Sequence, residues 1–155
     1  MSRGTPGGVD QFFGLPQDPR CFYYRTFQTA VDKESHLYEF VVPMVPPAWN
    51  DRDRVQHHRA RIAGGAVPTA VAVTKLDRCQ PATTRPVPDQ HEHWGLTHFL
   101  LDGHHKFEAA AEVGAPLLLL SLVAIDDSLA TSHDVARLPE LRDRPRSARP
   151  ASAAP

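Results

Sequence analysis

The first part of the chain shows short apolar runs separated by polar breaks, a pattern typical of β-strands. Runs rich in aromatic and β-branched residues occupy positions 21–27 and 37–42, with the polar segment QTAVDKES between them. Two such runs around a polar connection predict a hairpin. A further run at 67–76, VPTAVAVTKL, predicts another strand.

Between these strands, the spacing of apolar residues predicts a helix ending at Ala63. Asn50 and Asp51 are candidate caps at its start, and glycines at 64 and 65 supply the stop. Arginines and histidines fill the other helical positions, which indicates a solvated basic face. The stretch 77–95 has prolines at 81, 86 and 88 and no periodicity, so we expect a long loop there.

The second half predicts a strand, a turn, a helix and a second strand in close succession. An apolar run at 96–101 ends at Asp102 and Gly103, and a helical pattern follows over 105–113 with Glu108 and Glu112 as an exposed pair. Gly114 ends that helix. The continuous apolar run at 117–125 predicts a strand buried on both faces, and strand–helix–strand order makes parallel pairing the default.

These elements predict one small α/β (α+β) domain with a mixed sheet and packed helices. The domain is expected over 20–128, between a glycine- and proline-rich flexible arm at 1–19 and a mostly disordered tail rich in Pro, Arg and Ala at 129–155.

Composition restricts the partners of this domain. A formal net charge of −1 gives no overall field for nucleic acid, which argues against DNA as a partner. The start of the chain is polar, and the longest apolar run is far shorter than a membrane span, so we expect a cytoplasmic protein without membrane contact. Cys21 and Cys79 make no disulfide framework, and the sequence leaves open both their pairing and the oligomeric state.

The turn after the 96–101 strand carries the most informative chemistry. Gly103 permits a tight turn, and His104, His105 and Lys106 fall in the first turn of the next helix. Cations at a helix N-terminus cost about 0.3–1 kcal/mol, and a bound anion such as phosphate would reverse that sign. The alternative is a polar turn into a surface helix, in which Asp102 is only a helix cap.

The segment HFLLDGHHKFEAAAEVGAPLLLLSLV, together with PTAVAV after the two glycines, resembles the ParB/sulfiredoxin-like superfamily over about residues 50–125. The resemblance implies a nucleotide whose phosphates contact Gly103, His104, His105 and Lys106. His104 stands where similar sulfiredoxins have a reactive cysteine, which argues against sulfinic acid reduction. Lys106 replaces the usual arginine, which keeps the charge but loses the bidentate fork. The proline-rich tail shows no helix-turn-helix pattern like that of chromosome-partitioning proteins, so partition-type DNA binding is not expected.

Some members of this superfamily are small-molecule kinases, so the resemblance implies a phosphotransferase. The expected reaction is phosphoryl transfer from a nucleoside triphosphate or diphosphate (ATP, ADP or CTP, with Mg²⁺ as a candidate companion ion) to an unidentified small molecule. Asp102 and His104 are the acid–base candidates, and Arg61 is a further phosphate contact if its helix packs beside the turn. The alternatives are a non-catalytic nucleotide-binding regulator and a metal-dependent ParB-like nuclease.

A metal site is the remaining chemical alternative, because five histidines lie between positions 91 and 105: His91, His93, His98, His104 and His105. His91 and His93 have no standard structural zinc spacing, and Cys79 has no close partner in sequence, so no metal ligands are assigned.

Overall fold

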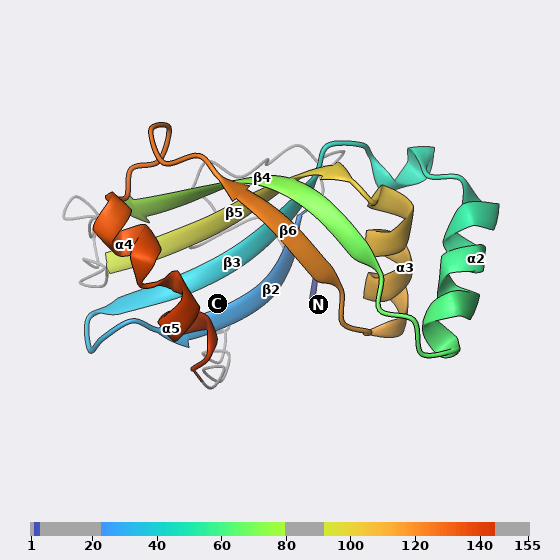
Figure 1. Cartoon of the computed structure of the whole chain (residues 1–155), viewed down its shortest axis with the longest axis horizontal. Helices are drawn as coiled ribbons and strands as arrows, with labels where there is room; N and C mark the ends of the chain where they lie inside the picture. The colour runs from blue at the N-terminus through green and yellow to red at the C-terminus, as the bar shows by residue number, and fades with distance from the viewer. Residues whose placement is uncertain (1, 4–22, 80–91, 145–155) are drawn as a thin grey trace, which may run out of the picture.

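The structure is a computed structural model that describes residues 2–3, 23–79 and 92–144. Its centre is a mixed sheet with the strand order β1-β2-β3-β5-β4-β6. The strands are β1 (Ser2–Arg3), β2 (Tyr24–Ala30), β3 (Ser35–Pro43), β4 (Thr69–Cys79), β5 (Glu92–Asp102) and β6 (Leu118–Val123). The helices are η1 (Pro47–Trp49), α2 (Arg52–Ala63), α3 (His104–Val113), α4 (Ser132–Ala136) and α5 (Leu138–Arg142). The predicted single small α/β domain with a mixed sheet and packed helices is therefore confirmed (Figure 1).

The predicted hairpin is present as β2 and β3, and it contains an irregularity that matters for the site. The two strands are antiparallel, with a register shift between Arg25 and Phe27. A β-bulge inserts one extra residue, which breaks the alternation of side chains between the two faces. Thr26 and Phe27 consequently both point to the face of the sheet that carries Glu39, and all three line one cavity.

Helix α2 begins and ends where its capping residues predict. Asp51 accepts hydrogen bonds from the backbone N–H groups of Asp53 and Arg54, at 2.9 and 3.3 Å. Gly64 is the C-cap residue. Figure 1 shows α2 on the far side of α3 from the sheet, so α2 packs against a helix. Only Val55 of α2 is buried, in agreement with this peripheral position.

The prediction of a parallel pair around α3 is wrong. Strand β4 lies between β5 and β6; it pairs antiparallel with β5 and parallel with β6, so β5 and β6 run in opposite directions. Helix α3 lies across the end of the sheet rather than back along it (Figure 1). The chain therefore enters β6 at the same end at which it leaves β5, which rules out a parallel crossover.

The prediction that the 117–125 run is buried on both faces is also wrong. Burial alternates along β6, and its outer residues Leu118, Leu120 and Leu122 are 61%, 63% and 55% exposed. The inner positions at 119, 121 and 123 are half-buried. Strand β6 pairs only with β4 among the described residues, so it is an edge strand with one packed face.

Two other segments differ from the loops predicted for them. Strand β4 continues to Cys79 and β5 begins at Glu92, which shortens the predicted 77–95 loop; residues 80–91 lie outside the described ranges. The predicted tail contains α4, which begins with a capping box at Thr131 and Asp134, and α5. Most of the predicted arm lies outside the described residues, although residues 2–3 pair with β2.

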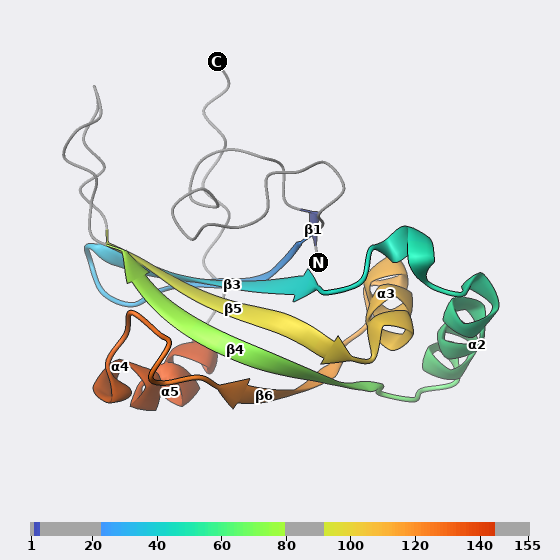
Figure 2. The same ribbon diagram turned by 90° about the horizontal axis from the view of Figure 1, so that it is seen from above.

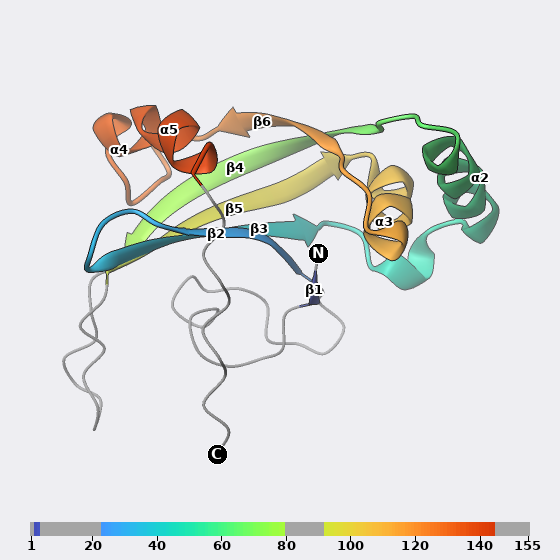
Figure 3. The ribbon, with the colours of Figure 1, turned by 90° about the horizontal axis from the view of Figure 1, so that it is seen from below.

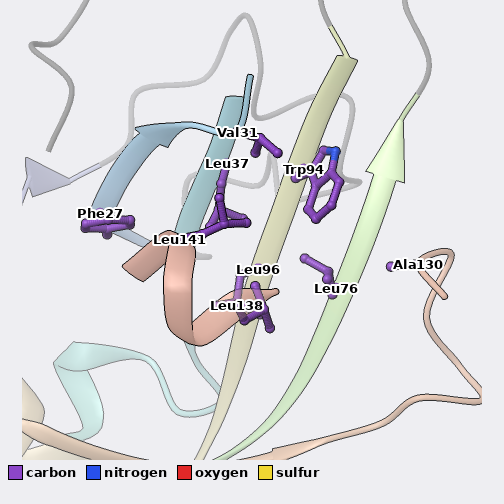
Figure 4. Packing of buried hydrophobic residues seen from close by; sticks show 9 residues of the cluster. All are labelled: Phe27, Val31, Leu37, Leu76, Trp94, Leu96, Ala130, Leu138 and Leu141. Atoms are coloured by element: carbon purple, nitrogen blue, oxygen red, sulfur yellow. The ribbon is translucent and has the colours of Figure 1, made fainter. Parts of the chain in front are cut away.

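One face of the sheet carries two apolar clusters separated along the strands. The first lies under α5, where Leu138 and Leu141 pack with residues of β2 to β5 and of the connecting segments, as Figure 4 shows: Phe27, Val31, Leu37, Leu76, Trp94, Leu96 and Ala130. The second surrounds Phe107 of α3 and contains Tyr24, Val41, Ala70 and Leu100. Figures 2 and 3 show α5 and α3 near opposite ends of the strands. The middle of this face, between the two clusters, is where polar side chains are buried.

Among the described residues, no helix is long and apolar enough to cross a membrane.

Candidate functional site

The turn between β5 and α3 is held tightly against the neighbouring strand. Gly103 has a φ of +90°, and a Cβ at this position would lie 2.8 Å from the Cβ and 3.0 Å from the Cα of Ala70. Only glycine combines that backbone conformation with such a close approach. The Gly103 carbonyl accepts from the backbone N–H of Phe107 at 2.8 Å, so α3 begins directly after the turn.

His104, the first residue of α3, has a ring nitrogen without a partner among the described residues. Its Nε2 is buried and has no hydrogen bond, while the ring makes a hydrogen bond to the Leu100 carbonyl. Burial lowers the pKa of His104, and the negative charge of Asp102 opposes that shift. The ring therefore favours its neutral form, with Nδ1–H donating to Leu100 and a lone pair on Nε2. Asp102 is exposed at the end of β5, opposite Val71.

Polar side chains hold α2 against α3. His105 Nε2 accepts from the Asp51 backbone N–H at 3.1 Å. Arg52 donates to Glu108 at 2.7 Å and to Glu112 at 2.9 Å. The prediction of an exposed pair is wrong for Glu108, which is buried, and confirmed for Glu112, which is exposed; both carboxylates pair with Arg52 of α2. The predicted solvated basic face of α2 is present in part: Arg52, Arg54 and Arg61 are exposed, whereas His58 and Arg59 are half-buried.

This contact also creates a small basic cavity. It measures about 150 Å³ and is lined by residues of α2, of the segment leading into β4 and of α3: His58, Arg61, Ile62, Ala66, Val67, Pro68, Thr69 and Lys106. Three of these described lining residues are basic and none is acidic. We call it the basic cavity. Its volume is several times the roughly 30 Å³ that a water molecule occupies in the liquid. A phosphate group therefore fits inside it.

The basic cavity contains only part of the predicted site. Lys106 lines it, and its Nζ donates to the Thr69 carbonyl at 3.2 Å. Arg61, predicted to reach phosphate if α2 packed beside the turn, lines the same cavity. His58 is a third member, and its place on a basic helix was the only sign of it in the sequence. Asp102, Gly103, His104 and His105 do not line it.

The positive charge around His58 affects its protonation. Burial lowers the pKa of His58, and the positive charges of His57, Lys106, Arg61 and His105 lower it further. A histidine surrounded by cations loses its proton more readily because the charged form is repelled. An anion in the cavity would act in the opposite direction on the same group.

A second polar cluster lies in the middle of the face that carries the two apolar clusters, and the sequence did not predict it. Each of five strands contributes one side chain: Thr26, Glu39, His98, Thr74 and Ser121. We call this the polar row. Glu39 Oε1 lies 3.2 Å from His98 Nε2, and His98 Nδ1 lies 2.7 Å from Thr74 Oγ1 and 3.1 Å from Ser121 Oγ. Thr26 donates to the other Glu39 oxygen.

The polar row is buried, and the charge of Glu39 within it is compensated by hydrogen bonds and neighbouring positive charge. Glu39 is 5% exposed and His98 is 2% exposed. Burial by itself raises the pKa of Glu39, but hydrogen bonds from His98 and Thr26 and the charges of His98 and Arg142 outweigh it and hold the pKa below its usual value. The one sign of this cluster in the sequence was a single carboxylate inside the otherwise apolar run LYEFVV.

Within the described ranges, no three His, Cys, Asp or Glu side chains lie close enough to hold a metal ion. His91, one of the five histidines of the metal alternative, lies outside those ranges. Cys79 is half-buried at the end of β4, and its candidate partner Cys21 lies outside the described ranges.

Comparison of the chain with models of known families, with curated proteins and with solved structures gave no match.

Proposed function

We propose that this protein binds a nucleotide through its phosphates in the basic cavity and transfers a phosphoryl group to a small molecule. One observation carries the binding part: His58, Arg61 and Lys106 come from two helices and line one cavity to which no described carboxylate contributes. Placing like charges together is unfavourable unless an anion binds between them. Arg61 supplies a planar fork of donors and Lys106 a point charge, a combination suited to adjacent phosphates.

The phosphoryl-transfer part of the proposal is supported by the resemblance to the ParB/sulfiredoxin-like superfamily and by fewer structural contacts than the binding part. Phosphoryl transfer depends mainly on positioning and on neutralising charge, for which the three basic groups provide the means. Asp102 and His104 are the acid–base candidates. The free lone pair of His104 Nε2 is suited to accept a proton, but it is buried, so the turn must open before a substrate can reach it. Asp102 is accessible as it stands.

The binding part is tested by titration calorimetry with pyrophosphate, ATP, ADP and CTP, each with and without Mg²⁺. We expect saturable binding that weakens as salt is added. Replacing Arg61 or Lys106 by alanine should weaken it roughly tenfold or more, because a hydrogen bond to a charged group contributes about 1.5–3 kcal/mol. Arg54→Ala is the matched control: Arg54 lies on α2, has a 72% exposed side chain and does not line the cavity.

An equal loss in Arg54→Ala, or no saturable binding of any probe, would contradict the basic cavity as a phosphate site. Binding without nucleotide turnover in the presence of candidate acceptors would instead favour the non-catalytic regulator. Chelator-sensitive cleavage of phosphodiesters would favour the nuclease.

The protonation of His58 gives an independent check. A bound phosphate raises the lowered pKa of His58, so binding takes up protons and should strengthen as the pH falls below neutrality. Titration of the His58 ring by NMR, with and without pyrophosphate, measures this shift directly. A pKa that does not rise on binding would place the anion elsewhere.

A further inference from the structure

A second cavity lies over the polar row, and the proposed function does not use it. It measures about 210 Å³ and is lined by residues from β2, β3, β6, α3, the segment between α3 and β6, and α5: Thr26, Phe27, Glu39, Val41, Phe107, Gly114, Ala115, Leu117, Leu119 and Arg142. We call it the concave cavity. Lys106 and Phe107 are neighbours in α3 but line different cavities.

The polar groups of the concave cavity are held in place by contacts with one another, as in a binding site. The Glu39 side chain is only 7% exposed and contacts the cavity, His98, Thr26 and Arg142. A carboxylate accepts about four hydrogen bonds, and these three described donors leave room for another. Arg142 Nη2 lies 3.2 Å from Glu39 Oε1, and its side chain is 51% exposed at the rim. Arg142 thus has donors that face solvent.

The charges of the lining select the kind of ligand. Among the described lining residues, only Glu39 and Arg142 are charged, and they already form an ion pair, so the cavity as a whole is neutral. A cationic or anionic ligand would have to separate that pair and would leave one member uncompensated, which is costly next to buried apolar surface. A neutral ligand leaves the pair intact.

Hydroxyl groups match both members of the pair at once. A hydroxyl donates to a carboxylate and accepts from a guanidinium, so two adjacent hydroxyls can bridge Glu39 and Arg142. The remaining walls are mainly apolar, with two phenylalanines, Val41 and two leucines, and suit the C–H faces of such a molecule. A cavity of 210 Å³ is smaller than most drug-sized sites, which limits the ligand to about the size of a monosaccharide.

We infer that the concave cavity is a binding site for a small, neutral, polyhydroxylated molecule, held by Glu39 and Arg142. The inference does not depend on phosphate binding in the basic cavity. Its ligand is defined by vicinal hydroxyl groups and by the absence of net charge.

The test uses saturation-transfer NMR and amide chemical shifts of the full chain with D-ribose, D-glucose, myo-inositol and glycerol as probes. We expect saturable binding of at least one cyclic polyol, with shifts at Gly114 and Ala115, which line the cavity. Arg142→Ala, a change at a half-exposed side chain, should weaken binding at least fivefold, as expected for loss of a charge-assisted hydrogen bond. Ala115→Leu, which fills the cavity without touching the polar row, should abolish binding.

Lys106→Ala provides the reciprocal control. It should leave polyol binding unchanged while weakening pyrophosphate binding, and Arg142→Ala should do the reverse, so either proposal can fail alone. Absence of polyol shifts at tens of millimolar would overturn the inference. Arg142-dependent binding of glycine or of an alkylammonium ion in place of polyols would overturn it as well, because a charged ligand would then be the occupant.

Discussion

Two regions of this molecule gather ionisable side chains, and they do so in opposite ways. In the basic cavity, the cationic side chains of Arg61 and Lys106 lie beside His58, whose pKa is lowered, and none of the described lining residues is a carboxylate. In the polar row, Glu39 is buried but matched by His98, Thr26 and Arg142. The uncompensated cluster is the arrangement from which we propose anion binding, whereas a compensated buried cluster contributes to the fold whether or not a ligand binds. Mutations in the basic cavity should therefore affect mainly anion binding, and loss of a buried partner inside the polar row should affect mainly stability.

The largest expected effect is the loss of a partner inside the polar row. His98→Leu leaves Glu39 buried with a donor missing, and we expect it to lower the free energy of unfolding by about 3–5 kcal/mol. Thr74→Val keeps the shape and removes one hydroxyl, so about 1 kcal/mol is expected. Urea denaturation followed by circular dichroism measures both. Equal small losses in the two variants would show that Glu39 and His98 are not coupled, and would remove the distinction between the regions.

The next effect concerns the turn that leads into α3. Gly103→Ala brings a methyl group within 2.8 Å of the Ala70 Cβ at a φ of +90°, and we expect a loss of about 2–4 kcal/mol from strain and crowding together. Gly114→Ala is the matched control, because that residue also has a positive φ, +67°, but a Cβ added there would meet nothing within 4 Å. It should cost about 1–2 kcal/mol. Thermal unfolding of the two variants separates close packing from backbone strain, and equal losses would mean that Ala70 does not restrict the turn.

The two regions also differ in how far the sequence predicted them. The turn at Gly103 and the start of α3 were predictable because glycine conformation and helix spacing act over a few residues. The contact of α2 with α3 was not, because it depends on tertiary ion pairs such as Arg52 with Glu108. The polar row depends on strand order and on the bulge at Thr26, neither of which leaves a local pattern.

The errors in the predicted fold also arise from tertiary structure that leaves no local pattern in the sequence. A continuous apolar run such as the one in β6 is compatible with burial on two faces or on one, and only strand order decides between them. The five-residue helices α4 and α5 are too short for a periodic signal. The capping box at Thr131 and Asp134 stabilises α4, and Leu138 and Leu141 of α5 pack on the sheet. The proline- and arginine-rich sequence around them has the composition of a disordered tail.

The polar row should also make stability depend on acidity. The pKa of Glu39 is lower in the folded protein than in the unfolded chain, so its contribution is present above the ordinary carboxyl range and is lost as the pH falls through the folded value. One such group changes the free energy of unfolding by at most about 1.4 kcal/mol per pH unit. Urea denaturation between pH 3 and 6, roughly the range of carboxyl titration, should show a shallower slope for Glu39→Gln than for the wild type. Parallel slopes would mean that Glu39 contributes nothing to the acid sensitivity.

The smallest effect is expected at Arg52. A change there should affect anion binding while leaving stability nearly unchanged, which tests the difference between the two regions directly. Arg52 connects α2 to Glu108 and Glu112 of α3, but its side chain is 54% exposed, and ion pairs in that position are screened by solvent. Arg52→Ala should therefore change the melting temperature less than either glycine variant. It loosens the helix that carries His58 and Arg61, so pyrophosphate affinity should fall by roughly twofold. Arg54→Ala, whose ion-pair partner is Asp51 of its own helix cap at 3.9 Å, should change neither quantity.

A stability loss in Arg52→Ala as large as in His98→Leu would show that the contact between α2 and α3 is part of the core. The basic cavity would then be as much a structural feature as the polar row.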